Sequence, residues 1–82
     1  MRLIAGIDIG NATTEVALAE ADGDRLTFLA SSTIPTTGIK GTDANIQGIF
    51  HALNVALKNG GRQLGDLDLV RINEAAPVIG DV

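Results

Sequence analysis

The chain has 82 residues, 45% of them hydrophobic, which suits one small domain that buries roughly 60–65% of its unfolded surface. Two Phe and no Trp or Tyr leave the core to aliphatic side chains, and the absence of Cys excludes disulfides and Cys-containing zinc sites. A net charge of −4 without Lys or Arg clusters disfavours nucleic acid as a partner, and no apolar run is long enough to cross a membrane, so we expect a cytoplasmic protein.

Two apolar runs near the N-terminus predict a β-hairpin. Residues 3–7 form a nearly continuous β-rich run, which is typical of a strand buried on both faces. Residues 14–19 suit a second strand, and the side chains that share one face are Thr14, Val16 and Leu18. Residues 10–13 between the runs are small and allow a tight turn.

An acidic residue, Asp8, closes the first run just before this turn. Backbone N–H groups of such a turn can surround an anion, and threonine hydroxyls add further donors. The carboxylate of Asp8 can hold a hydrated Mg²⁺ that bridges to phosphate oxygens. We therefore predict a nucleotide site in which Asp8 binds magnesium through water. The predicted nucleotide contacts are Gly10, Asn11, Ala12, Thr13 and Thr14.

A purely structural interpretation of the same residues stays open. Gly10 and Asn11 can serve only to turn the hairpin, because small and Asx residues favour such turns. Asp8 can likewise accept hydrogen bonds from neighbouring backbone, as Asp often does. An Asp and a Gly two residues apart are a weak signal by themselves.

The next segment predicts a third strand. Asp22 and Gly23 form a dipeptide that favours a second hairpin turn, and residues 26–32 are again β-rich. Pro35 ends this strand because it has no N–H for a sheet ladder. Three strands joined by short turns give an antiparallel meander.

A glycine-containing loop and the best helix of the chain follow. Lys40 in the loop can reach a phosphate or a partner's carboxylate, or can be an ordinary surface lysine. The helix is expected over residues 43–58, capped by Thr42 or Asp43 and ended by two glycines. Its predicted sheet-facing side consists of Ile46, Ile49, Phe50, Leu53 and Leu57. His51 lies off that stripe and is expected to be a surface histidine.

Residues 67–73 predict a last strand, parallel to its neighbour if the helix makes the usual right-handed crossover. Asn73 and Glu74 at its carboxyl end are then candidates for a cleft or partner contact, and the alternative is an Asx turn and a loop acid with no such role. Residues 77–82 are apolar and carry no stop signal, so we expect residues 1–82 to be a single partial domain cut from a longer protein.

Three stretches of the sequence resemble one family. Residues 4–18, IAGIDIGNATTEVAL, are similar to the first phosphate-binding hairpin of the actin, Hsp70 and sugar kinase superfamily. More narrowly they resemble the start of the large subunit of the diol/glycerol dehydratase reactivating factors. Residues 36–42, TTGIKGT, and 72–82, INEAAPVIGDV, agree with that family as well.

The resemblance implies an α/β fold, the N-terminal unit of a ribonuclease-H-like, actin-like ATPase. In this family ATP and ADP, with Mg²⁺, drive release of damaged cobalamin from a diol or glycerol dehydratase, in the manner of a chaperone. The implied partners are that dehydratase and a small reactivase subunit, with possible location at a bacterial microcompartment. The second phosphate loop would lie outside this sequence, so we expect no catalytic residue here.

Two other functions remain open from the sequence. One is a sugar or polyol kinase of the same superfamily, whose acceptor-activating base would also lie outside these residues. The other is a non-enzymatic protein-interaction module that uses its sheet. Because later segments would normally cover that sheet, the isolated fragment is also expected to self-associate.

Overall fold

The computed structural model describes residues 1–36 and 42–74, so Lys40 and residues 75–82 lie outside the described residues. It contains strands, one α-helix and a short 3₁₀ turn. In chain order these are β1 Arg2–Ile9, β2 Thr13–Asp22, β3 Arg25–Pro35, α1 Asp43–Asn59, η1 Leu64–Asp66 and β4 Leu69–Glu74. No helix in this part of the chain has the length and apolar character needed to cross a membrane.

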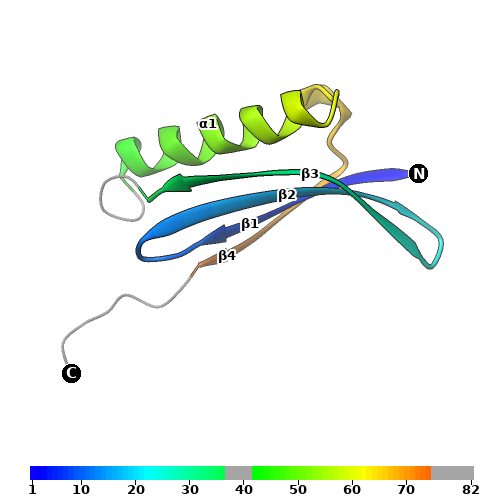
Figure 1. The fold of residues 1–82 in the computed structure, drawn as a ribbon, viewed down its shortest axis with the longest axis horizontal. Coiled ribbons are helices and arrows are strands. Elements are labelled where there is room, and N and C mark those ends of the chain that lie inside the picture. Colours follow the sequence, from blue (N-terminus) through cyan, green and yellow to red (C-terminus); the bar gives the residue numbers. More distant parts are fainter. Residues whose placement is uncertain (37–41, 75–82) are drawn as a thin grey trace.

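The strands form one sheet in the order β3-β2-β1-β4. β1, β2 and β3 are antiparallel neighbours, and β4 runs parallel to β1. Gly23 adopts a positive φ of 61° in the tight turn between β2 and β3, a conformation that favours glycine. The antiparallel meander, the helix and the parallel strand therefore confirm the predicted α/β arrangement (Figure 1).

Helix α1 lies along only one face of the sheet (Figure 1), and the core forms between them. On β1 the alternate residues from Leu3 to Ile9 are at most 5% exposed, whereas Gly6 and Asp8 between them are exposed. The prediction that β1 is buried on both faces is thus wrong within the described residues. The sequence suggested burial on both faces because Ile4 and Gly6, on the open face, make the apolar run look continuous although neither residue is fully buried.

The helix begins as predicted, with Thr42 as its N-cap. Its predicted sheet-facing side is confirmed in part, because Leu53 and Leu57 are buried in the core and Ile49 packs against it. Ala52 and Ala56 are fully buried, and such small side chains let the helix approach the sheet closely. Ile46 and Phe50, predicted to face the sheet, remain 43% and 52% exposed. They line an apolar groove of about 310 Å³ that continues along α1 toward Val70 and Ile72 of β4.

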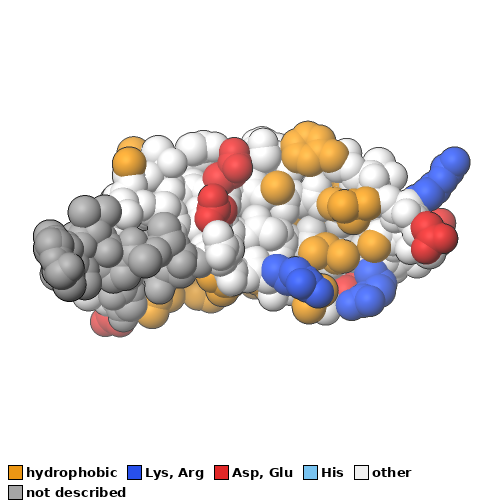
Figure 2. Space-filling view, turned by 90° about the horizontal axis from the view of Figure 1, so that it is seen from below, with side chains coloured by type: hydrophobic (Ala, Val, Ile, Leu, Met, Phe, Trp, Pro, Cys, Tyr) orange, Lys and Arg blue, Asp and Glu red, His pale blue; other side chains and the backbone are white. Residues whose placement is uncertain are grey.

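A β-bulge divides β3 into two parts that face opposite ways. The β2–β3 register shifts between Leu18, which pairs with Ala30, and Ala19, which pairs with Phe28. Because one extra residue reverses the alternation of side chains, Phe28 turns away from the helix and is 65% exposed. The face of the sheet opposite α1 therefore carries hydrophobic side chains (Figure 2).

Asp68 fixes the start of β4 against β1. The backbone N–H of Leu3 donates to Oδ2 of Asp68 at 2.8 Å, and the N–H of Asp68 donates to the carbonyl of Leu3 at 2.9 Å. This pairing sets the register that places Asn73 beside Asp8. Glu74 is the last residue of β4 and pairs with Ile9, whereas the sequence placed it just beyond the strand.

Candidate functional site: the β1–β2 turn and the adjoining open face

The predicted phosphate-binding turn joins β1 to β2 and is closed by a hydrogen bond. The N–H of Gly10 donates to the carbonyl of Thr13 at 2.9 Å. A Cβ atom at Gly10 would lie only 2.8 Å from that carbonyl oxygen, closer than carbon and oxygen can approach. Glycine is therefore required at position 10 by close contact. Asn11, Ala12 and Thr13 follow it and are all exposed.

Thr14 occupies a different environment from the rest of the turn. It is 1% exposed and lies on the covered face, like Val16. Its Oγ1 is 3.0 Å from Oγ1 of Thr36, and Thr36 in turn donates to the carbonyl of Gly10 at 2.8 Å. The hydroxyl of Thr14 thus supports the turn from beneath, while that of Thr13 belongs to an exposed residue.

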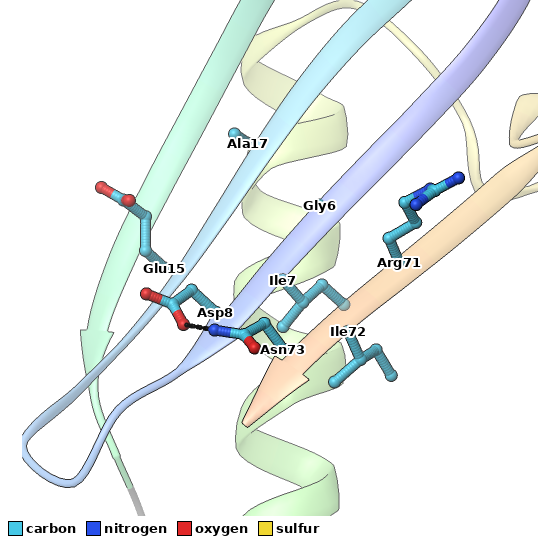
Figure 3. Close-up of a pocket in the computed structure, with 8 residues that line it drawn as sticks. All are labelled: Gly6, Ile7, Asp8, Glu15, Ala17, Arg71, Ile72 and Asn73. Atoms are coloured by element: carbon cyan, nitrogen blue, oxygen red, sulfur yellow. Dashed lines mark hydrogen bonds between the residues drawn. The ribbon is translucent and has the colours of Figure 1, made fainter. Parts of the chain in front are cut away.

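Asp8 projects from the open face of β1, beside Asn73 of β4 (Figure 3). The amide Nδ2 of Asn73 donates to Oδ1 of Asp8 at 3.0 Å. The two residues are register partners in the parallel β1–β4 ladder, so their side chains emerge on the same face. The structure therefore brings together two residues that the sequence singled out separately.

A second carboxylate, Glu15, lies across from Asp8 and was missed by the sequence reasoning. Asp8 and Glu15 are paired in the antiparallel β1–β2 ladder, and both are exposed on the open face. Like charges in this position destabilise a sheet, and a cation between or beside them would offset the repulsion. The sequence could have predicted this pair. A turn closed between Gly10 and Thr13 makes Ile9 and Thr14 partners in the hairpin, and the next pair along the strands is Asp8 and Glu15.

These side chains border a hollow of about 460 Å³ in the open face (Figure 3). Its middle is lined by Gly6 and Ala17, which are register partners and leave space above the strands. Arg71 is the one basic residue among the lining residues, and its side chain points away from the carboxylates in Figure 3. The polar end of the hollow is therefore acidic and lies next to the turn.

The donors at this end suit a hydrated divalent cation. Within residues 1–36 and 42–74 there is no group of three or more His, Cys, Asp or Glu side chains that could hold a metal directly. Two carboxylates and an amide can still bind the waters of an Mg²⁺ ion, which keeps much of its hydration shell in proteins. This donor set fits the water-mediated role predicted for Asp8.

Comparisons with solved structures identify the class of fold. A PPX-GPPA enzyme of Aquifex aeolicus matches 89% of this chain and 26% of its own, with a TM-score of 0.56 at 18% identity. A likeness at this identity concerns the fold alone. Together with the strand order, it confirms the N-terminal unit of the ribonuclease-H-like, actin-like ATPase fold.

Closer relatives are the large subunits of dehydratase-reactivating factors. The chain is 58% identical to the propanediol dehydratase-reactivating factor large subunit of Citrobacter freundii and 55% identical to the diol dehydratase-reactivating factor large subunit of Klebsiella michiganensis. Both matches cover 100% of this chain and 14% of the relative. A diol dehydratase-reactivating factor in nucleotide-free form matches with a TM-score of 0.83 at 55% identity, over 99% of this chain and 14% of its own.

By sequence and fold, the chain is similar over its whole length to part of the dehydratase-reactivating factor large subunits, which confirms the resemblance that its motifs predicted. It spans 14% of the length of these curated relatives. No family model matches the sequence.

Proposed function

We propose that residues 1–82 form part of the actin-like ATPase domain of a dehydratase-reactivating factor large subunit. The observation that carries this proposal is the 55–58% identity to such subunits over 100% of the chain. The full protein would use ATP and ADP to release damaged cobalamin from a diol or glycerol dehydratase, assisted by a small reactivase subunit. It would act in the cytoplasm, where it could associate with a bacterial microcompartment.

The turn would provide one part of the nucleotide site. Its residues Asn11, Ala12 and Thr13 are exposed and would lie beside the phosphate oxygens, and Gly10 allows the closed turn that presents them. Thr14 would act by supporting the turn, because its hydroxyl is buried against Thr36.

Asp8 would hold the water shell of Mg²⁺, and Glu15 would add a second charge on the same face. A bound Mg²⁺ would neutralise charge on the phosphate oxygens. Asn73 would keep the Asp8 carboxylate oriented through its hydrogen bond. This contact would be the way in which Asn73 takes part in the cleft. Glu74 and Lys40 remain weaker candidates for contact with a partner or with the cleft.

The fragment alone is not expected to hydrolyse ATP, because positioning in phosphoryl transfer needs groups from both sides of a nucleotide. We expect an affinity no better than about 1 mM, which corresponds to about −4 kcal/mol. Steady-state ATPase activity of the purified 82-residue chain that disappears in Asp8→Ala would contradict this expectation.

The reactivating function is tested with the full-length protein. Together with its small subunit, ATP and Mg²⁺, it should restore activity to a diol or glycerol dehydratase inactivated by damaged cobalamin. Asp8→Asn should reduce this rescue, while Arg25→Gln, at the far end of β3, should not. Phosphorylation of a sugar or polyol without rescue would instead favour the kinase function, which the names of the relatives do not favour.

Self-association of the fragment is a further part of the proposal. Leu26 and Phe28 are 70% and 65% exposed, and they pair with Ala21 and Ala19 on the open face. A second copy of the chain could cover this surface (Figure 2). Light scattering at high concentration should detect dimers or larger species, and the double change Leu26→Ser with Phe28→Ser should reduce them. A strictly monomeric fragment would contradict the proposal.

A further inference from the structure

Thr36, directly after β3, contacts the predicted phosphate-binding turn through both its backbone and its side chain. Its N–H donates to the carbonyl of Ala12 at 2.9 Å. Its hydroxyl donates to the carbonyl of Gly10 at 2.8 Å. Thr36 thus binds two carbonyls of the same turn from a segment that is distant in sequence.

The direction of the hydroxyl protons follows from this arrangement. A hydroxyl has one proton, and that of Thr36 is used on the carbonyl of Gly10. The 3.0 Å contact between the hydroxyls of Thr14 and Thr36 must then have Thr14 as the donor. A relay therefore runs from Thr14 through Thr36 to Gly10. Thr14 is 1% exposed, so water cannot easily replace its part of the relay.

The two hydrogen bonds of Thr36 to the carbonyls of Gly10 and Ala12, called the clamp from here on, also set the direction of the N–H groups in the turn. In a planar trans peptide the C=O and the following N–H point to opposite sides, and the described residues contain no cis peptide bond. The carbonyls of Gly10 and Ala12 point toward Thr36, so the N–H groups of Asn11 and Thr13 are turned away from it. Backbone N–H groups that point away from Thr36 are the donors that such a turn can offer to an anion.

We propose that Thr36 is a positioning residue for nucleotide binding, whose hydroxyl holds the Gly10 peptide in the orientation that presents the turn to phosphate. The proposal rests on the proposed function and deepens it, because it assigns to Thr36 a role that the sequence motifs gave only to residues of the hairpin. Thr36 touches no nucleotide in this role. It acts through the carbonyl of Gly10.

The test compares three variants of the full-length protein. Thr36→Val keeps the shape and the backbone N–H but removes the hydroxyl, Thr36→Ser keeps the hydroxyl, and Thr27→Val is the matched control. Thr27 is an exposed threonine of β3, paired with Glu20 far from the turn. The readouts are the affinity for MgATP and MgADP by calorimetry, and amide hydrogen exchange of peptides that cover residues 10–14.

Thr36→Val should weaken nucleotide binding by about 3- to 10-fold, the usual range for one net hydrogen bond, and should speed exchange in the turn. Thr36→Ser should restore both readouts, and Thr27→Val should change neither. Unchanged affinity and unchanged exchange in Thr36→Val would overturn the proposal.

Two further outcomes separate this inference from the proposed function. If the unsubstituted protein binds no nucleotide but Thr36→Val still speeds exchange, the clamp stands and the nucleotide-binding function fails. If Thr36→Val does not fold, Thr36→Ala replaces it, because it also removes the hydroxyl that donates to the carbonyl of Gly10. Thr36→Ala should then weaken nucleotide binding and speed exchange in the turn, and no change in either readout would overturn the proposal.

Discussion

The two faces of the sheet are built from the same strands but carry different kinds of side chains. On the face beneath α1, side chains such as Leu3, Ile7 and Leu18 are at most 5% exposed and form the core. On the open face, the neighbouring positions hold Gly6, Asp8 and Glu15, none of which contributes to that core. Stability is therefore concentrated on one face. The other face carries a glycine within a strand and a pair of like charges, which are features that stability alone does not favour.

The comparison can be tested most strongly with two leucines on neighbouring strands. Leu18→Ala on the covered face should cost about 2–5 kcal/mol, because Leu18 is fully buried and its removal leaves a cavity. Leu26→Ala should cost much less, since Leu26 is 70% exposed on the open face. Urea unfolding of both variants measures the difference. Equal losses would mean that the open face is also part of a packed core.

Two glycines near the site should respond in opposite directions to the same substitution. Gly10→Ala should destabilise the protein by about 1–3 kcal/mol, because the added Cβ would overlap the carbonyl of Thr13. Gly6→Ala meets no atom within 4 Å and should stabilise it by about 0.5–1 kcal/mol. Thermal unfolding provides the measurement. A destabilising Gly6→Ala would show that something in the protein already occupies the hollow.

Two adjacent serines of β3 give a smaller contrast. The hydroxyl of Ser32 donates to the carbonyl of Ala52 in α1 at 2.6 Å, so Ser32→Ala should cost about 0.5–1.5 kcal/mol. Ser31 is exposed and pairs with Ala17 on the open face, so Ser31→Ala should change the free energy of unfolding little. Denaturant titrations of both variants would decide, and equal effects would argue against the contact between β3 and α1.

The smallest expected change in stability concerns the carboxylate pair, and it has the opposite sign to the change in function. Asp8→Asn keeps the shape of the side chain and removes the repulsion from Glu15, so it should stabilise the fold by about 0.2–1 kcal/mol. In the full-length protein the same change should lower Mg²⁺-dependent nucleotide turnover by about tenfold or more, or about 1.4 kcal/mol in the barrier.

Glu15→Gln should stabilise the fold by a similar amount, because it removes the same repulsion between the two carboxylates. It is therefore the control for the effect of charge on stability. Thermal unfolding and steady-state turnover, measured on the same preparations, test both variants. Loss of stability in Asp8→Asn with full turnover would favour the interpretation of Asp8 as a residue that only caps the turn.

The sequence by itself determined the local elements and their order. Hydrophobic spacing, the Asp22-Gly23 turn, the Thr42 cap and the glycines after the helix each act within a few residues, so they could be recognised without the fold. The motif from Asp8 to Thr14 likewise indicated a resemblance to dehydratase-reactivating factors, which the relatives confirm. The nucleotide roles of its residues remain predictions.

Only the tertiary structure decided which face each side chain occupies and which distant residues meet. One bulge residue reverses the alternation of side chains in β3 and turns Phe28 outward. No local sequence pattern predicted this bulge. The register of β4 against β1 places Asn73 on Asp8, and the end of β3 brings Thr36 to Gly10. The physical reason is that faces and contacts of this kind depend on strand register and on which side the helix covers, which are set by packing across the whole sheet.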